Sequence, residues 1–337
     1  MKAAWLETVG GPEALRTGDR PDPVPGPGEV VVRVRACSLN HLDLWVRRGK
    51  SFPRPLIPGS DITGVVDEVG PGVVTFASGD EVVAYPAVAE GETAPGGYAP
   101  LASSFRIFGA HRDGALAERV AVPASVLIRK PRALSWLDAA CLPIAFLTAW
   151  HMLFARARVQ PGETVLVQSA GSGVGHAAIQ MARLAGAMVF TTTGSPAKVD
   201  RALQLGAHHA INYVAEDPVK VVRELTGGRG ADVVVDHNGD RTWGTSVACL
   251  ARGGRLVVCG VTEGARVALD LGSFFYAAQS VLGSTLGTLD ELATVLSLTA
   301  CGPLKPVVDR VYPLCDIAEA HARLVSADRF GKVVIVM

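Results

Sequence analysis

The most informative segment of the sequence is Thr164-Val-Leu-Val-Gln-Ser-Ala-Gly-Ser-Gly-Val-Gly175. It begins with apolar and β-branched residues, as a buried strand does, and its glycines allow a tight turn before a helix. Such a turn brings backbone N–H groups and the positive end of a helix dipole close to a bound pyrophosphate. The spacing of Gly171, Gly173 and Gly175 is a variant of the strict G-x-G-x-x-G pattern. We interpret the stretch as a dinucleotide-binding turn, with a strand-to-helix turn that binds nothing as the alternative.

Short β-branched runs alternate with amphipathic stretches on both sides of this turn, as in a parallel sheet covered by helices. The expected strands cover residues 164–168, 188–192, 209–212, 232–236, 255–259 and 280–286. The expected helices between them cover residues 175–185, 196–205, 217–226 and 241–251. Six strands with their crossovers predict one doubly wound, six-stranded parallel α/β domain.

The N-terminal third has a different pattern, in which short strands are separated by clusters of proline and glycine such as residues 21–28. Its expected strands cover residues 30–36, 64–69, 81–84 and 116–122, and they predict a small, mostly antiparallel β domain. The C-terminal part is expected to form helices at 289–300 and 317–326 and strands at 305–312 and 332–336.

The composition limits the possible partners and the compartment. Among 337 residues, 32 Lys and Arg balance 32 Asp and Glu, so the chain lacks the broad positive field that nucleic-acid binding requires. The uncharged stretches 139–155 and 271–289 are interrupted by proline, glycine and hydroxyl residues, which favours buried core segments over membrane spans. No signal-peptide pattern is visible, and the six cysteines occur singly. We expect a cytoplasmic protein whose partner is a small molecule, not nucleic acid or a membrane.

The end of the second expected strand indicates which dinucleotide binds. An acidic residue about 20 positions after the glycines would favour NAD. The chain instead has Thr191-Thr-Thr-Gly-Ser195, followed by Lys198 and Arg201. Hydroxyl donors and positive charge suit a 2′-phosphate, so NADPH is the predicted cofactor, although both basic residues can also belong to a solvated helix face. A methyltransferase is another class with this glycine spacing, but it too usually needs an acid after the second strand.

Further motifs occur along nearly the whole chain, namely Ser38-Leu-Asn-His-Leu-Asp43, Ile57-Pro-Gly-Ser-Asp61, Gly79-Asp-Glu-Val82, Leu147-Thr-Ala-Trp150 and Phe330-Gly-Lys332. With the glycine turn, they resemble the medium-chain dehydrogenase/reductase superfamily, and most closely its zinc-free quinone oxidoreductase branch. The resemblance implies a GroES-like catalytic domain made of residues 1–140 and 287–337. It also implies a Rossmann domain at 141–286, an active-site cleft at the junction of the domains, and a homodimer.

Zinc alcohol dehydrogenases of this superfamily hold a catalytic metal with a Cys, a His and a later Cys. The matching positions here are Asn40, Ser60 and Ile144, none of which is a thiolate or imidazole ligand. Cys37 lies three residues before the first position, on the opposite face of an alternating strand. Residues 88–106, where a structural zinc would be bound, contain no cysteine. We therefore predict a metal-free enzyme, with a zinc-type alcohol dehydrogenase that uses His41 as a ligand as the alternative.

The candidate catalytic residues are Asn40, Asp43, Asp61 and Thr148. The Asn40 side chain can hydrogen-bond the cofactor amide or the substrate oxygen, or it can form an Asx turn that closes the strand. Asp43 and Asp61 can order water or a proton donor, or they can be structural carboxylates that pair with Arg47 or Arg48. In the quinone branch two positions are often tyrosine, and here they are Trp45 and Phe52, which keep an aromatic wall for a flat or apolar acceptor.

The candidate cofactor contacts are Asn40, Thr148, Ala170, Gly171, Ser172, Gly173, Val174, Gly175, Gly194, Ser195, Lys198, Tyr213, Gly260 and Lys332. Among them, the resemblance implies that Thr148 lies beside the nicotinamide and Tyr213 beside the adenosine phosphate. The predicted function is NADPH-dependent, zinc-independent transfer of a hydride to a quinone or an α,β-unsaturated carbonyl compound. A protein that binds NADPH without turnover is a further alternative.

Overall fold

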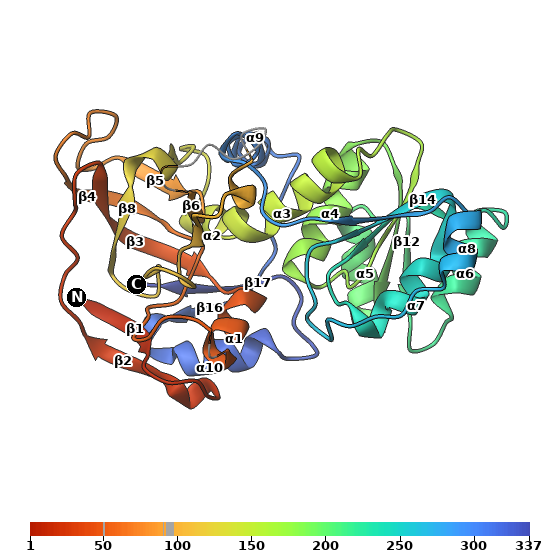
Figure 1. The fold of residues 1–337 in the computed structure, drawn as a ribbon, viewed down its shortest axis with the longest axis horizontal. Coiled ribbons are helices and arrows are strands. Elements are labelled where there is room, and N and C mark those ends of the chain that lie inside the picture. The colour runs from red at the N-terminus through yellow and green to blue at the C-terminus, as the bar shows by residue number, and fades with distance from the viewer. Residues whose placement is uncertain (50, 90, 92–97) are drawn as a thin grey trace. The chain divides into compact units, whose positions relative to one another are not determined.

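A computed structural model describes residues 1–49, 51–89, 91 and 98–337 of the chain. It divides into two compact units, one made of Met1–Leu147 and Thr288–Met337 and the other of Thr148–Gly287. In Figure 1 the first unit contains both ends of the colour scale, and the second contains the green and cyan middle of the chain. The first boundary was expected at 140/141. It lies at Leu147/Thr148, inside a continuous helical stretch.

The second unit is built on a sheet of six parallel strands in the order β12-β11-β10-β13-β14-β15. The strands are β10 (Thr164–Val167), β11 (Met188–Thr193), β12 (His209–Asn212), β13 (Ala231–Asp236), β14 (Leu250–Val258) and β15 (Ser280–Gly283). All four residues of β10 are buried, as expected of a strand covered on both faces. The order confirms the predicted doubly wound fold, in which ligands bind at the carboxyl ends of the strands.

Helices cover this sheet, as Figure 1 shows for the green and cyan ribbons. The helical elements of this unit are α3 (Leu147–Trp150), which begins at the unit boundary, α4 (Gly173–Leu184), α5 (Pro196–Gln204), α6 (Pro218–Leu225), α7 (Asp240–Cys249), α8 (Leu271–Tyr276) and the π-helical segment η6 (His151–Arg156). Helix α4 packs on β10 and β11, and α7 packs on β13 and β14. Leu166, Val234 and Leu256 lie in one buried cluster with Val222 of α6, so one apolar core joins sheet and helices.

The first unit is built on a sheet in the order β16-β17-β3-β4-β5-β9, with β8 also paired to β3. These strands are β3 (Glu29–Ser38), β4 (Thr63–Val69), β5 (Glu81–Ala84), β8 (Arg119–Pro123), β9 (Leu127–Arg129), β16 (Val308–Pro313) and β17 (Lys332–Val336). All pairs are antiparallel except β16 with β17. The mostly antiparallel β domain predicted for this part of the chain is therefore confirmed.

Several elements of this unit were not expected. They are the hairpin of β1 (Lys2–Leu6) and β2 (Leu15–Asp19), helix α1 (His41–Arg48), the pair β6 (Ala87–Ala89) and β7 (Phe105–Ile107), helix α2 (Trp136–Ala140) and the π-helical η5 (Leu142–Phe146). Helices α9 (Leu289–Ala300) and α10 (Ile317–Leu324) were expected. Part of the segment 88–106, discussed above for a structural zinc, lies outside the described residues.

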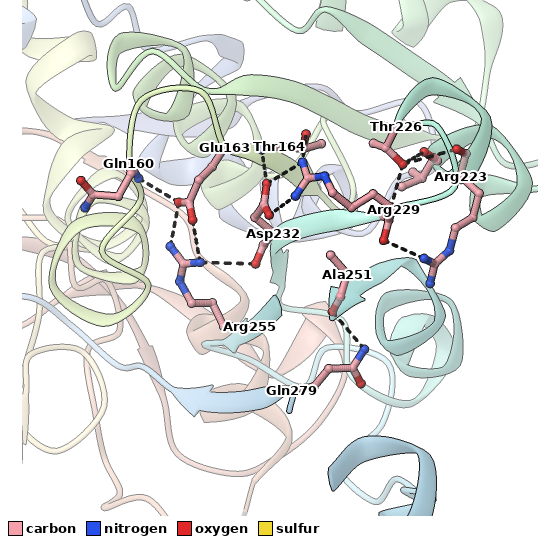
Figure 2. A network of polar contacts seen from close by, with 12 residues as sticks. Gln160, Glu163, Thr164, Arg223, Thr226, Arg229, Asp232, Ala251, Arg255 and Gln279 are labelled. Carbon is pink, nitrogen blue, oxygen red and sulfur yellow. Dashed lines mark hydrogen bonds and ion pairs between the residues drawn. The ribbon is translucent and has the colours of Figure 1, made fainter. Parts of the chain in front are cut away.

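Ion pairs hold the amino ends of β10 and β13 together, and Figure 2 shows them. Arg255 binds both oxygens of Glu163, with Nη1 2.9 Å from Oε1 and Nη2 2.7 Å from Oε2. The Arg255 guanidinium also donates to the carbonyl oxygens of Ala157 and Arg158. Asp232 accepts from the amide of Thr164 at 2.7 Å and from the guanidinium of Arg229. The amino end of the sheet is therefore held together by ion pairs and hydrogen bonds.

Replacing Arg255 by Met is expected to lower the free energy of unfolding by about 2 to 3 kcal/mol, because a partly buried guanidinium that donates to several hydrogen-bond acceptors is lost. Urea denaturation followed by circular dichroism measures this change. The matched control is Arg241→Met, which removes an exposed pair with Glu263 and is expected to cost less than about 1 kcal/mol. Equal losses in the two variants would contradict the structural role of Arg255.

Candidate active site

The Asp61 carboxylate is the centre of a buried polar cluster in the first unit. Its Oδ2 accepts from the Ser38 hydroxyl at 2.5 Å and from the Asn40 amide at 2.9 Å. Its Oδ1 accepts from the backbone N–H of Ile144 at 2.9 Å, and the Lys332 ammonium lies 3.4 Å from Oδ2. The Asp61 side chain is fully buried, so these donors replace the water that a carboxylate needs. The cluster thereby joins four segments that are far apart in the sequence.

The sheet explains why Lys332 meets Asn40. Strands β17 and β3 are antiparallel with Val334 opposite Ser38, and the same register continued by two residues brings Lys332 opposite Asn40. The Lys332 Nζ then donates to Asn40 Oδ1 at 2.5 Å. Asn40 Nδ2 donates to Asp61 and, at 3.3 Å, to the carbonyl oxygen of Ser38. Both amide hydrogens of Asn40 are therefore used inside the cluster, and its orientation is fixed.

Asp43 lies in the first turn of α1, beside this cluster. One carboxylate oxygen accepts from the backbone N–H of Asn40 at 2.7 Å, and the other accepts from that of Gly59 at 3.1 Å. Burial raises the pKa of Asp43 to about 6, while the Asn40 and Gly59 amides lower it and the Asp61 charge raises it. Asp43 and Asp61 thus have backbone amides, Ser38, Asn40 and Lys332 as partners, and no contact with Arg47 or Arg48 was found among the described residues. Asn40 precedes α1 as its N-cap.

The Asp43 carboxyl predicts a pH dependence of stability. Because its pKa is higher in the folded protein than the ordinary value of 3.8 for an aspartate, it contributes stability that is fully present below pH 3.8 and is lost as the pH rises through 6. This loss amounts to about 3 kcal/mol. We expect the free energy of unfolding of the wild type, minus that of Asp43→Asn, to fall by about this amount between pH 4 and pH 7. A difference that stays constant over this range would contradict the assignment.

The three positions that match zinc ligands do not form a metal site. The Asn40 amide is held by Lys332 and Asp61, and the Ser60 hydroxyl donates to the carbonyl oxygen of Phe108 at 2.7 Å. The Ile144 side chain has no donor atom. Within the described residues, no group of three His, Cys, Asp or Glu side chains could hold a metal ion. Cys37 is fully buried and burial raises the pKa of its thiol, which disfavours a thiolate ligand. The donors present therefore do not fit a catalytic zinc.

The aromatic residues noted in the sequence lie close to this cluster along the chain. Trp45 is in α1 with 37% of its surface exposed, and Phe52 is partly buried. The Phe52 ring meets the His111 ring edge to face, with centroids 5.9 Å apart. Thr148, the fourth candidate catalytic residue, is buried in α3 of the second unit, whereas Asn40, Asp43, Asp61 and Lys332 come together in the first.

The glycine turn of the second unit has the geometry of an anion site. Ser172 is the N-cap of α4, and its hydroxyl accepts from the backbone N–H of Gly175 at 2.8 Å. The hydrogen bonds between described residues leave the next amides, those of Gly173 and Val174, without an acceptor. A Cβ at Gly175 would lie 2.2 Å from the carbonyl oxygen of Ser169, so only glycine fits there. Partly exposed amides at a helix N-terminus suit a pyrophosphate.

The carboxyl end of β11, the strand next to β10, carries hydroxyl groups. The Thr193 hydroxyl is buried and has no hydrogen-bond partner among the described residues, as expected of a group that a ligand would satisfy. A Cβ at Gly194 would lie 2.5 Å from the Tyr213 hydroxyl, so Gly194 makes room for that ring. The Tyr213 backbone N–H donates to the Thr193 carbonyl oxygen at 3.0 Å. These residues fit the adenosine end of a dinucleotide.

Of the remaining predicted contacts, Ala170 is buried and donates its N–H to the Thr192 carbonyl oxygen at 2.9 Å. Gly260 follows β14, where a Cβ would lie 3.0 Å from the His237 carbonyl oxygen. Ser195 is the N-cap of α5, which also carries Lys198. Apart from Thr148 in α3, the predicted cofactor contacts of the second unit thus lie at or just beyond the carboxyl ends of β10, β11, β12 and β14, as in other doubly wound sheets. Lys332 belongs to the first unit.

Comparison with known proteins identifies the family of this chain. Residues 26–132 match the family described as alcohol dehydrogenase GroES-like domain, and residues 173–300 match zinc-binding dehydrogenase. Two similar proteins are quinone oxidoreductase of Rattus norvegicus (30% identical, 100% of this chain and 98% of the relative) and 2-haloacrylate reductase of Burkholderia sp (32%, 99% and 98%). A solved structure titled NAD-dependent alcohol dehydrogenase is 45% identical over both full chains, with a TM-score of 0.96.

The chain belongs to the medium-chain dehydrogenase/reductase superfamily. The predicted family is therefore confirmed, and the protein is an oxidoreductase. Among the described residues, no helix of this dehydrogenase/reductase is long and apolar enough to cross a bilayer.

Some site residues could not be found from the sequence. Ser38 and the Ile144 backbone amide complete the hydrogen bonding of the Asp61 carboxylate. Ser169, Asn238 and Asp236 lie beside the glycine turn. Ser169 has a φ of +59°, which its sequence position does not reveal because serine rarely adopts this conformation. The one available signal was position: Ser38 and Asp236 end apolar strands, and Ser169 and Asn238 lie two residues after such a strand.

Proposed function

We propose that the protein is an NADPH-dependent, zinc-independent reductase of quinones or α,β-unsaturated carbonyl compounds. The observation that carries the proposal is the Asp61 cluster. At the positions of zinc ligands, the chain has the Asn40 amide held in this cluster by Lys332 and Asp61, the Ser60 hydroxyl bound to a backbone carbonyl outside it, and an isoleucine. A metal that polarises a substrate oxygen has no ligand set here.

The acceptor class follows from what a metal-free site can reduce. A quinone or enone is already activated by conjugation, so hydride transfer needs positioning and a local charge more than a Lewis acid. The names of the quinone oxidoreductase and the 2-haloacrylate reductase support conjugated acceptors. Trp45 and Phe52 supply aromatic surface for a flat acceptor.

The second unit has the residues to hold the cofactor. NADPH, when bound, supplies the hydride. The unpaired amides of Gly173 and Val174 would bind the pyrophosphate, and the Thr193 hydroxyl would bind near the adenosine ribose. In the first unit, the Lys332 ammonium supplies a fixed positive charge and holds Asn40 in one orientation.

The preference for NADPH rests on the neutral end of β11 and on Lys198 of α5. Changing Lys198 to Ala is expected to raise the Kd of NADPH about tenfold and that of NADH less than twofold, because only NADPH carries the 2′-phosphate. Fluorescence titration of both dinucleotides measures this, with Lys220→Ala on the exposed face of α6 as the control. An equal loss for both dinucleotides would remove the proposed phosphate contact.

A screen of acceptors tests the activity. Consumption of NADPH is followed at 340 nm with quinones, enals, acrylates and simple aldehydes, on protein of known metal content. We expect turnover with the conjugated acceptors and none with the simple aldehydes. Turnover confined to the simple aldehydes would favour the second candidate, a zinc-type alcohol dehydrogenase, and the similar structure titled NAD-dependent alcohol dehydrogenase supports the alcohol dehydrogenase part of that alternative.

We also propose that the protein is a homodimer, formed at the edge strand β15 and the neighbouring α8. Strand β15 ends the six-stranded sheet and pairs on one side with β14. Leu271, Phe275 and Tyr276 of α8 are 69 to 75% exposed. Light scattering at micromolar concentration is expected to give the mass of a dimer, and a monomer mass would contradict the proposal. The cytoplasm stays the predicted compartment, in keeping with six free cysteines.

A further inference from the structure

A chain of buried hydrogen bonds joins the carboxyl ends of β10, β11 and β13 in the second unit. Ser246 donates to Asp236 Oδ2 at 2.6 Å, and Gln168 Nε2 donates to the Ser246 hydroxyl at 3.0 Å. Thr192 donates to Gln168 Oε1 at 2.6 Å, and the backbone N–H of Ser169 donates to the Thr192 hydroxyl at 3.1 Å. The side chains from Asp236 to Thr192 are at most 2% exposed. We refer to these five residues as the Asp236 chain.

The direction of every bond in the Asp236 chain is fixed by its first member. A carboxylate only accepts, so the Ser246 hydroxyl must donate to Asp236 and accept from the Gln168 amide nitrogen. The Gln168 oxygen therefore faces Thr192, whose hydroxyl must donate to it. The Thr192 oxygen is then left as an acceptor for the Ser169 N–H. A side-chain amide at position 236 could donate as well as accept, so the direction of these hydrogen bonds would no longer be fixed.

A second branch from the same carboxylate reaches the Ser169 side chain. Asp236 Oδ1 accepts from the Asn238 backbone N–H at 2.8 Å, and Asn238 Nδ2 donates to the Ser169 hydroxyl at 2.8 Å. Ser169 has a φ of +59°, in the left-handed region that costs a non-glycine residue about 1 kcal/mol or more. Its carbonyl oxygen accepts from the N–H of Ser172, the N-cap of α4. Both branches therefore end on the residue that starts the glycine turn.

We propose that Asp236 is a positioning residue for the dinucleotide turn, acting through the Asp236 chain and Asn238. This inference rests on the proposed cofactor site. Asp236 is 1% exposed and held by four donors, so it acts without touching the ligand. Fixing Ser169 before the ligand arrives aims the amides of Gly173 and Val174 in advance, and a site that is ordered in advance loses less entropy on binding.

The test compares two carboxylates at opposite ends of β13. Asp236→Asn is expected to raise the Kd and KM of NADPH at least tenfold and to leave kcat at saturating NADPH within about twofold. Asp232→Asn is the matched control, because Asp232 binds Arg229 and the Thr164 amide at the amino end of the same strand. It is expected to lower stability and to leave the Kd of NADPH unchanged. Fluorescence titration, steady-state kinetics and thermal unfolding are measured on each variant.

Ser246→Ala provides a second variant if Asp236→Asn does not fold. It breaks the chain at one hydroxyl, leaves Asp236 with its other donors, and is expected to raise the Kd of NADPH at least fivefold. The inference would be overturned, and the proposed cofactor site would stand, if each variant that folds bound NADPH within twofold of the wild type. The same would follow if Asp232→Asn weakened NADPH binding as much as Asp236→Asn. A wild-type protein that binds neither NADPH nor NADH would overturn the proposed cofactor site and the inference with it.

Discussion

Replacing Lys332 by Met is expected to lower the free energy of unfolding by about 3 to 5 kcal/mol. The substitution keeps the length of the side chain but removes the ammonium that donates to Asn40 and lies 3.4 Å from Asp61. The Asp61 carboxylate, with no exposed surface, would then be a buried charge without a cation. Chemical denaturation measures the loss, and Lys2→Met, which removes an exposed pair with Asp19, is expected to change stability by less than about 1 kcal/mol.

The double variant Asp61→Asn with Lys332→Met separates the charge pair from side-chain packing. Because it removes both charges together, we expect it to be more stable than the sum of the single losses predicts, by at least about 1 kcal/mol. Losses that simply add would show that Lys332 and Asp61 do not compensate each other. The same variants report on activity, since Asn40 loses its fixed orientation when either partner is removed.

Replacing Gly175 by Ala is expected to weaken dinucleotide binding about 100-fold, or about 3 kcal/mol. The new Cβ would lie 2.2 Å from the Ser169 carbonyl oxygen and 2.7 Å from the Ser172 hydroxyl, so the turn must move. The amides of Gly173 and Val174 would then lose their alignment toward a pyrophosphate. Isothermal titration with NADPH and with NADH measures the change, which should be similar for both dinucleotides because they share the pyrophosphate.

The control for this substitution is Gly244→Ala in α7, where a Cβ meets nothing within 4 Å. Alanine in a helix interior is expected to stabilise the protein by about 0.5 to 1 kcal/mol, with unchanged binding. If Gly175→Ala binds NADPH as tightly as the wild type, the ligand does not use this turn. A loss of folding in Gly175→Ala is detected by circular dichroism and is distinguished from a loss of binding.

The doubly wound sheet could be predicted because its local signals agree. Residues of β10 and β13 are buried on both faces, so they form continuous apolar, β-branched runs, and glycines mark the turn after β10. Helix α1 was missed because it has only eight residues, two of its four buried residues, Asp43 and Arg47, are charged, and a strand precedes it closely. The π-helical η5 was missed because Pro143 breaks the usual helix pattern.

The partners within the site could not be predicted to the same extent. Asn40, Asp43, Asp61 and Lys332 were all recognised as candidates, but the pairing of Lys332 with Asn40 was not, because the two are 292 positions apart and meet only through the pairing of β17 with β3. A lysine is usually exposed, and nothing local marks this one as buried. The Asp236 chain is similar, because its members come from two strands, the turn after β10 and one helix.

Metal content measured together with turnover tests whether zinc has a role in the reaction. The purified protein is dialysed against a chelator, its zinc is determined by mass spectrometry, and NADPH oxidation with a quinone and an enal is measured before and after. We predict less than about 0.1 zinc per chain and unchanged turnover, since the cluster has Lys332 as its fixed cation. One tightly bound zinc per chain, with activity lost on its removal and restored by zinc, would contradict the account.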